Sequence, residues 1–208
     1  MKQKGYFITF EGPDGSGKTT ISNLVYQKLK DNQFDCVYTR EPGGIEIAEK
    51  IRDIILNPEH ITMDKKTEAL LYAASRRQHL IEKVLPALEN NKIVICDRFV
   101  DSSLAYQGVG RDIGFDEVYA INEFAIEGHL PDLTIFLDID AETGLKRIQD
   151  RAFKDRLDLE DISFHERVFE GYQEVLRKFK KRIVLVDARK TIDEIVEDSY
   201  RIIVERLD

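Results

Sequence analysis

The residues from Gly12 to Thr19 have the types and the spacing of a loop that binds phosphate groups. They read Gly12-Pro13-Asp14-Gly15-Ser16-Gly17-Lys18-Thr19, which is the pattern G-x-x-x-x-G-K-T. Glycines allow successive backbone N–H groups to turn inward around an anion, and a following helix adds its N-terminal dipole. Lys18 would bring a cation to the β- and γ-phosphates, and the Thr19 hydroxyl would ligate Mg²⁺. The pattern predicts a bound nucleoside triphosphate but no particular reaction.

A charged pair, Asp97 and Arg98, comes directly after the apolar run 93–96. A carboxylate at the end of a buried strand beside a phosphate loop helps to hold the metal, so Asp97 is a candidate ligand together with Thr19. Arg98 would clamp a phosphate. The alternative interpretation is that the two residues form a surface ion pair.

Short apolar runs alternate along the chain with long helical patterns, and these elements must position the charged groups. The runs predict strands at residues 6–10, 35–39, 93–96, 133–138 and 182–186. Helices are predicted at residues 18–30, 45–56, 65–90, 114–127, 141–152, 161–179 and 191–206. The last of these begins with the capping box Thr191-x-x-Glu194. The alternation predicts an α/β fold with a parallel, doubly wound sheet, whose functional loops follow the carboxyl ends of the strands.

The length of 208 residues fits one domain, 1–208. The 39 acidic residues exceed the 31 basic ones and give a net charge of −8, which argues against nucleic acid or an anionic membrane as a partner. It leaves room for a small anion at one basic spot, because charges act over about 8 Å at physiological salt. No stretch of about 18 residues lacks charge, so we expect no membrane span and a cytoplasmic protein. Cys36 and Cys96 lie in apolar runs and are expected to be buried thiols.

A missing motif and the chain length exclude two classes of phosphate-loop protein. A GTPase would carry N-K-x-D to read guanine, but Asn91-Lys92 is followed by Ile93 and Val94. The chain is also short for an ATPase motor. A small-molecule kinase remains, and such an enzyme needs a second pocket for the phosphoryl acceptor.

Three segments together resemble the bacterial thymidylate (dTMP) kinases. They are Phe10-Glu11-Gly12-Pro13-Asp14-Gly15-Ser16-Gly17-Lys18-Thr19-Thr20, Thr39-Arg40-Glu41-Pro42-Gly43-Gly44, and Asp97-Arg98-Phe99-Val100-Asp101-Ser102-Ser103-Leu104-Ala105-Tyr106-Gln107-Gly108. Asn122-Glu123-Phe124-Ala125 and Pro131-Asp132-Leu133-Thr134 are similar to that family too, so the resemblance runs nearly end to end. It implies a three-layer P-loop kinase fold with a five-stranded parallel sheet, helices on both faces and a short lid at about residues 150–160.

The resemblance also implies roles for individual residues. Arg40 would hold the acceptor phosphate, Arg98 would bridge the acceptor and donor phosphates, and Asp97 would act near the metal. Asp14 would meet the acceptor's 3′-hydroxyl, and Tyr106 would lie under the sugar where a ribose 2′-hydroxyl collides. The residues implied at the base are Ser103, Gln107, Arg76 and, one helical turn earlier, Tyr72.

Helical spacing bears on the last of these roles. Tyr72 and Arg76 are four residues apart and share a helix face, where an aromatic plane and a planar fork of donors can hold a base. The residues alone favour a core tyrosine beside a surface arginine, whereas the resemblance assigns both to the site. Tyr106 and Gln107 fit a polar loop equally well. Arg52 either reaches the acceptor or lies on a solvated helix face.

The basic segment 151–158 joins two predicted helices and would form the lid. The family places a catalytic arginine either in the phosphate loop or in the lid, and Gly15 at the loop position indicates the second arrangement. Arg151 and Arg156 are then the candidates, with Arg151 preferred. The alternative is a solvated charge run.

These observations lead to one hypothesis with two alternatives. The hypothesis is transfer of the γ-phosphoryl group from Mg·ATP to dTMP, giving dTDP, with catalysis by Lys18, Asp14, Arg98 and a lid arginine. The resemblance implies a homodimer. The alternatives are a kinase for another nucleoside monophosphate and a nucleotide-binding module without catalysis. Seven cationic side chains are expected to converge on one cleft of an acidic body: Lys18, Arg40, Arg52, Arg76, Arg98, Arg151 and Arg156.

Overall fold

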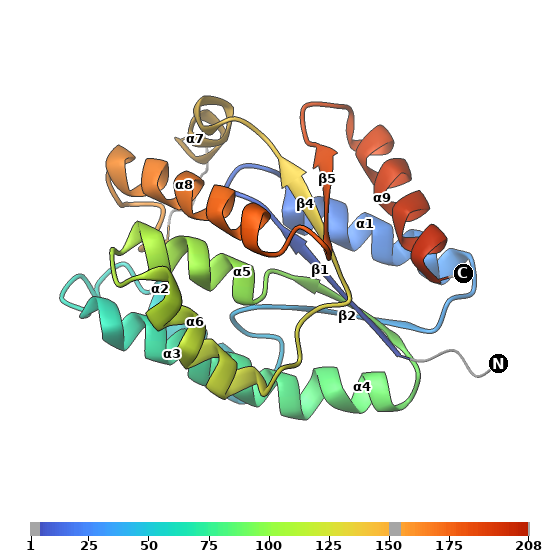
Figure 1. The fold of residues 1–208 in the computed structure, drawn as a ribbon, viewed down its shortest axis with the longest axis horizontal. Helices are drawn as coiled ribbons and strands as arrows, with labels where there is room; N and C mark the ends of the chain where they lie inside the picture. Colours follow the sequence, from blue (N-terminus) through green and yellow to red (C-terminus); the bar gives the residue numbers. More distant parts are fainter. Residues whose placement is uncertain (1–4, 150–154, 208) are drawn as a thin grey trace.

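The structure, a computed structural model, describes residues 5–149 and 155–207. Its centre is a sheet of five parallel strands in the order β2-β3-β1-β4-β5 (Figure 1). The strands are β1 Tyr6–Glu11, β2 Cys36–Arg40, β3 Ile93–Asp97, β4 Leu133–Asp138 and β5 Ile183–Asp187. All five predicted strands are therefore confirmed, with ends that shift by one residue at most.

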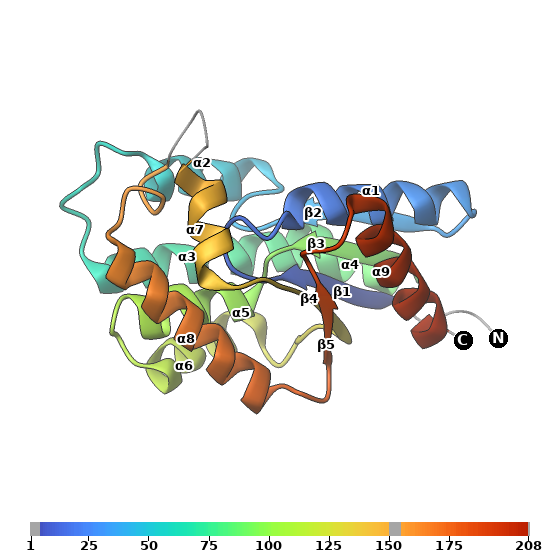
Figure 2. The same ribbon diagram turned by 90° about the horizontal axis from the view of Figure 1, so that it is seen from above.

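Helices cover both faces of the sheet, which gives the three layers that the resemblance implied (Figures 1 and 2). Successive side chains of a strand enter opposite layers, since Phe7 packs among the helices on one face while Ile8 and Phe10 pack among those on the other. One layer is made by α1 Lys18–Asp31 and α9 Ile192–Leu207. The opposite core includes side chains from α2 Glu46–Leu56, α3 Lys65–His79, α6 Phe115–Ile126 and α8 Ile162–Lys178.

The predicted helix at 65–90 is one helical stretch that changes its pitch. It consists of α3, a π-helical turn η1 at Leu80–Val84 and α4 at Leu85–Glu89. Pro86 is the second residue after this turn, and proline has no N–H to donate to the carbonyl four residues before it. The helix widens where the normal hydrogen bond cannot form. At the other end of the chain, Thr191 and Glu194 form the predicted capping box, with Thr191 N–H donating to Glu194 at 3.0 Å.

The region after β3 is helical and is not the polar loop that one of the two interpretations of Tyr106 and Gln107 proposed. Residues 100–110 form α5 at Val100–Ser103, followed by a π-helical segment η2 at Leu104–Gly110. Of the helix predicted at 141–152, α7 is described over Ala141–Gln149, and residues 150–154 lie outside the described part.

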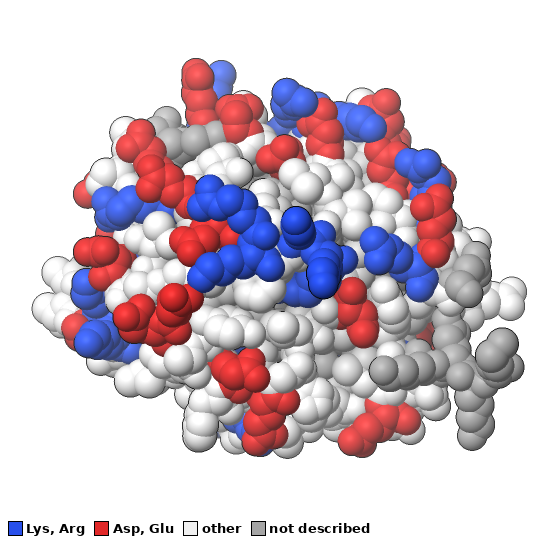
Figure 3. All heavy atoms as spheres, in the orientation of Figure 1, with Lys and Arg blue, Asp and Glu red and all other residues white. Residues whose placement is uncertain are grey.

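The surface carries charges of both signs. On the face presented in Figure 3, Lys and Arg gather across the middle of the molecule and Asp and Glu lie around them. Among the described residues, no helix is long and apolar enough to cross a membrane. Cys36 and Cys96 are both buried and unpaired, as the apolar runs around them predicted.

Candidate functional site: a phosphate loop beside an acceptor pocket

The eight residues of the predicted phosphate loop connect β1 to α1 and fold around the Lys18 side chain. The Lys18 ammonium donates to the Pro13 carbonyl at 2.7 Å and lies 3.4 Å from the Ser16 hydroxyl. Burial, with the nearby Arg98 guanidinium as the next cause, lowers the pKa of Lys18 to about 7. A bound anion would therefore stabilise the protonated form of Lys18 in this loop.

Gly15 could not be a larger residue without a change in the backbone. Its φ of +82° is in the left-handed region, and a Cβ there would lie 2.4 Å from the carbonyl oxygen of Gly144 in α7. This contact explains why the loop position lacks a basic side chain. Arg147 of α7 donates to the Gly15 carbonyl at 3.0 Å, which sequence reasoning missed because it considered only the arginines of the following segment.

Thr19 and Asp97, the two predicted metal ligands, lie in contact. The Thr19 hydroxyl donates to Asp97 Oδ2 at 2.5 Å, and Asp97 Oδ1 is buried without a hydrogen-bond partner among the described residues. A buried carboxylate oxygen without a donor beside a hydroxyl and a phosphate loop fits a hard divalent cation. The donor set is therefore suitable for Mg²⁺.

Asp14, Arg98 and Tyr106 join the loop to the neighbouring pocket. The Arg98 guanidinium donates to Asp14 Oδ1 and, at 3.1 Å, to the Ser102 hydroxyl, while the Tyr106 hydroxyl donates to Asp14 Oδ2 at 2.5 Å. Burial alone would lower the pKa of Arg98, but the Asp14 carboxylate outweighs it and holds this pKa well above its usual value. Arg98 is thus a permanent cation between the two halves of the site, and it pairs with Asp14 rather than with Asp97.

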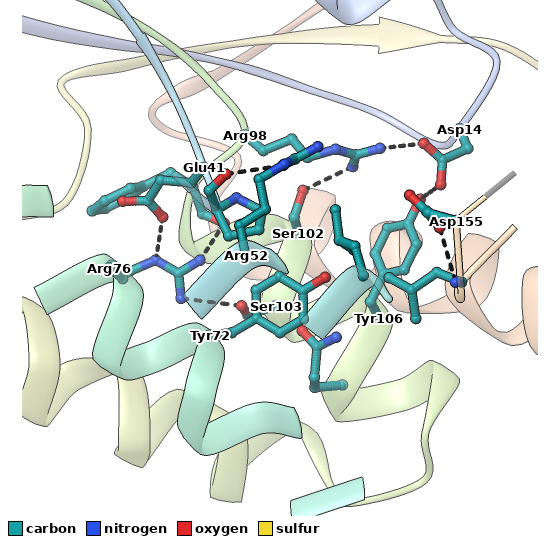
Figure 4. Close-up of a pocket in the computed structure, with 15 residues that line it drawn as sticks. Asp14, Glu41, Arg52, Tyr72, Arg76, Arg98, Ser102, Ser103, Tyr106 and Asp155 are labelled. Carbon is teal, nitrogen blue, oxygen red and sulfur yellow. Dashed lines mark hydrogen bonds and ion pairs between the residues drawn. The ribbon is translucent and has the colours of Figure 1, made fainter. Parts of the chain in front are cut away.

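A pocket opens beside this group (Figure 4). Its walls come from the phosphate loop, the turns after β2 and β3, helices α2 and α3, the α5–η2 segment, and Asp155 with Leu157. It brings together eight of the predicted residues: Asp14, Arg52, Tyr72, Arg76, Arg98, Ser103, Tyr106 and Gln107.

Arg76 is a buried pocket residue and not a surface arginine, with only 2% of its side chain exposed. Its guanidinium donates to Glu41 at 2.7 Å, to Ser103 at 3.0 Å and to the Phe99 carbonyl at 3.0 Å. It also contacts Asn122. These partners fix the plane of the guanidinium at the wall of the pocket. Glu41 and Asn122 belong to the segments that carried the resemblance, but no role had been assigned to them.

Arg52 and Arg40 differ in their positions. Arg52 lines the pocket and donates to the Pro42 carbonyl at 2.9 Å, so it does not lie on a solvated helix face. Arg40 lies outside the pocket lining and pairs with both oxygens of Glu49 at 2.8 and 2.9 Å. The structure therefore does not bring Arg40 to the pocket with the others.

Of the two lid candidates, the structure describes Arg156. Arg151 lies outside the described residues. Arg156 is buried and donates to the Glu68 carboxylate at 2.6 Å and to the Ile55 carbonyl at 2.8 Å. The interpretation of Arg156 as part of a solvated charge run is wrong, because this guanidinium is held by a buried carboxylate.

Glu11 is a buried carboxylate that sequence reasoning did not single out. It accepts hydrogen bonds from the Phe99 amide at 2.7 Å and the Ser102 hydroxyl at 2.7 Å, so it fixes the start of α5 beside the phosphate loop. Burial, followed by the charge of Asp101, raises the pKa of Glu11 to about 7. In the sequence, the only indication of a role for Glu11 was its position directly before the phosphate loop.

Comparisons with known proteins agree with this arrangement. The family model described as "Thymidylate kinase" matches residues 10–199. A thymidylate kinase of Clostridium novyi is 56% identical over 197 residues, which cover 94% of this chain and 96% of the relative. One of a Geobacillus species is 53% identical over 99% of both chains. The solved thymidylate kinase of Ehrlichia chaffeensis superposes with a TM-score of 0.80 at 32% identity, covering 96% of this chain and 98% of its own.

Proposed function

This chain belongs to the thymidylate kinase family, and we propose that it transfers the γ-phosphoryl group of ATP to dTMP, giving dTDP for dTTP biosynthesis, across the junction of the phosphate loop and the pocket. The observation that carries this proposal is the Asp14–Arg98–Tyr106 group, which connects the phosphate loop to a pocket lined by polar side chains. A protein that only binds a nucleotide does not need a second pocket that is connected to its phosphate loop by hydrogen bonds.

On the donor side, the backbone of residues 12–17 and the Lys18 ammonium would hold the phosphates of ATP. Thr19 and the Oδ1 of Asp97, which has no hydrogen-bond partner in the described part of the chain, support a Mg²⁺ site there. The ion, when bound, would neutralise charge on the β- and γ-phosphates.

On the acceptor side, the polar groups of the pocket would bind the three parts of dTMP. Tyr72, Arg76, Ser103 and Gln107 are proposed to face the base, and Tyr106 and Asp14 the deoxyribose. Arg98, Arg52 and Arg40 are proposed to face the phosphate. Arg40 would have to leave Glu49 or act together with it, because the two are paired in the free protein.

The transfer itself needs alignment and charge neutralisation more than proton transfer. An oxygen of the dTMP phosphate forms a bond to the γ-phosphorus, the bond from that phosphorus to the β-bridging oxygen breaks, and ADP leaves. The attacking oxygen is already ionised at neutral pH, so no strong general base is required. Lys18, Arg98 and a lid arginine, for which we propose Arg151 with Arg156 as the second candidate, would offset the repulsion between the two anions.

We also propose a cytoplasmic homodimer. Support for the compartment comes from the two unpaired cysteines, which are typical of reducing surroundings. Support for the dimer comes from exposed apolar side chains on two adjacent helices, Leu70 on α3 and Phe124 on α6, which are 55% and 87% exposed. The Arg77–Glu127 ion pair of 3.0 Å joins these helices into one surface.

The proposed function is tested by measuring ADP formation from ATP with a panel of acceptors: dTMP, dUMP, dCMP, AMP and GMP. We expect rapid turnover with dTMP and slower turnover with dUMP, since one methyl group in an apolar pocket provides only about 1–3 kcal/mol of discrimination. Faster turnover with AMP or GMP would favour a different monophosphate kinase.

A further inference from the structure

Glu68 is a fully buried carboxylate on α3, one helical turn before Tyr72, and it lies behind the wall of the pocket. Three side chains from other segments donate to it. The Gln107 amide nitrogen lies at 2.8 Å, the Arg156 guanidinium at 2.6 Å and the Arg111 Nε at 3.1 Å. Two guanidinium groups around one carboxylate stabilise its charge, so Glu68 acts as a hydrogen-bond acceptor only.

This charge determines which end of the Gln107 side chain faces the pocket. The two ends of a carboxamide have nearly the same size, so packing does not distinguish them, but a carboxylate accepts only the NH₂ end. Gln107 lines the pocket, and its Oε1 has no hydrogen-bond partner among the described residues. The Gln107 carbonyl oxygen therefore faces the pocket. This oxygen is a hydrogen-bond acceptor, so a ligand must place an N–H group opposite it.

We propose that Glu68 is a positioning residue that fixes the polarity of Gln107 and so makes the site select a pyrimidine with an N–H at ring position 3. This inference rests on the proposed function, which places the acceptor base against Gln107. Thymine and uracil carry N3–H, whereas the N3 of cytosine is an acceptor that would face the Gln107 oxygen and leave both without a donor. An unpaired buried polar atom is costly, so the arrangement rejects cytosine.

The variant Glu68→Gln tests this directly. A neutral amide can accept from or donate to Gln107, so the carboxamide is free to turn its NH₂ group toward the pocket. We expect the ratio of kcat/KM for dTMP to that for dCMP to fall by about tenfold or more. The dTMP-to-dUMP ratio and the KM for ATP should stay unchanged, since neither depends on this polarity. Glu68→Asp, which keeps the charge, should retain the dTMP-to-dCMP ratio even if kcat falls.

The matched control is Glu160→Gln. Glu160 pairs with Arg111 at 2.6 Å within the same cluster but is no partner of Gln107, so this variant should leave all the ratios at their wild-type values. If Glu68→Gln does not fold, the double variant Glu68→Gln/Arg111→Gln removes one charge of each sign and serves in its place, with Arg111→Gln as its reference.

A folded Glu68→Gln enzyme that slows equally with dTMP, dUMP and dCMP would overturn the inference and leave Glu68 a structural role. That result would not affect the proposed function, which fails if the wild-type protein forms no dTDP from dTMP or turns over AMP or GMP faster than dTMP.

Discussion

At the scale of single residues, Lys18 is a cation whose charge depends on its ligand. Its pKa is lowered to about 7 in the free protein, above all by burial and then by Arg98. A bound triphosphate favours the protonated form and raises this pKa. Nucleotide affinity should therefore be constant below about pH 7 and fall above it, and binding at pH 8 should take up a proton.

Calorimetry at pH 8 in buffers of different ionisation enthalpy measures this uptake. The variant Lys18→Arg is the control, because arginine stays charged in the free protein and should remove the uptake. Equal binding enthalpies in all buffers for the wild-type protein would contradict the assigned state of Lys18.

Tyr106 should determine the choice of deoxyribose over ribose. Its ring is buried beside Asp14 and packs against Tyr172, with the ring centres 6.1 Å apart. The ring therefore cannot easily move to make room for a 2′-hydroxyl. Tyr106→Ala should reduce the preference for dTMP over its ribose analogue by roughly tenfold or more. Tyr106→Phe keeps the ring and should keep the preference, as measured by kcat/KM. Unchanged ribose rejection in a folded alanine variant would count against this role.

The residue types of the site were accessible from the sequence, but many of their partners were not. The loop residues, Asp97 and Arg98 follow from spacing and from their place after strands. Tyr72 and Arg76 needed the resemblance, because buried and exposed arginines have the same local pattern. Glu68 gave no local signal at all, since its three donors come from segments far away in the chain.

At the scale of elements, the close approach of α7 to the phosphate loop limits the residue at position 15. A side chain at Gly15 would adopt a left-handed backbone and meet Gly144. One at Gly17 would have the same strain, at φ +86°, with no atom of the described residues within 4 Å. Both Gly→Ala variants should lose about 1–2 kcal/mol from backbone strain. Gly15→Ala should lose measurably more in urea unfolding, and equal losses would contradict the contact with α7.

The strands were predictable because buried parallel strands are short apolar runs between polar turns. The α5–η2 segment was not. Its sequence, Val100 to Gly110, combines serines and glycines that are typical of loops, and it becomes helical because Glu11 and Arg76 bind its first turn. Tertiary contacts thus override local preference at the place where the site is built.

At the scale of the whole molecule, the expected positive cleft is better described as a set of paired charges. Arg52, Arg76 and Arg98 line the pocket, but Asp14, Glu41 and Asp155 line it as well. Counting cations in the sequence missed the carboxylates, because buried guanidinium groups need partners in the free protein. Of the seven cations expected to converge there, Arg40 pairs with Glu49 outside the pocket lining and Arg156 pairs with Glu68 in the free protein, and Arg151 lies outside the described residues.

The proposed dimer surface on α3 and α6 predicts the effect of a charge at its centre. We expect the wild-type protein to have twice the 24.1 kDa mass of one chain in light scattering, and Phe124→Glu to have the mass of one chain. Ile192→Glu, at another exposed apolar position, on α9, is the control and should remain dimeric. A wild-type mass of one chain at micromolar concentration would contradict the proposal.

The most direct measurement of the central claim is to identify the products formed from Mg·ATP and dTMP by phosphorus NMR. The account predicts dTDP and ADP in equal amounts with the wild-type protein, and neither with a folded Lys18→Ala variant, because the loop cation is lost. Two results would contradict the account. One is formation of ADP and inorganic phosphate without dTDP by the wild-type protein, and the other is formation of dTDP by the Lys18→Ala variant.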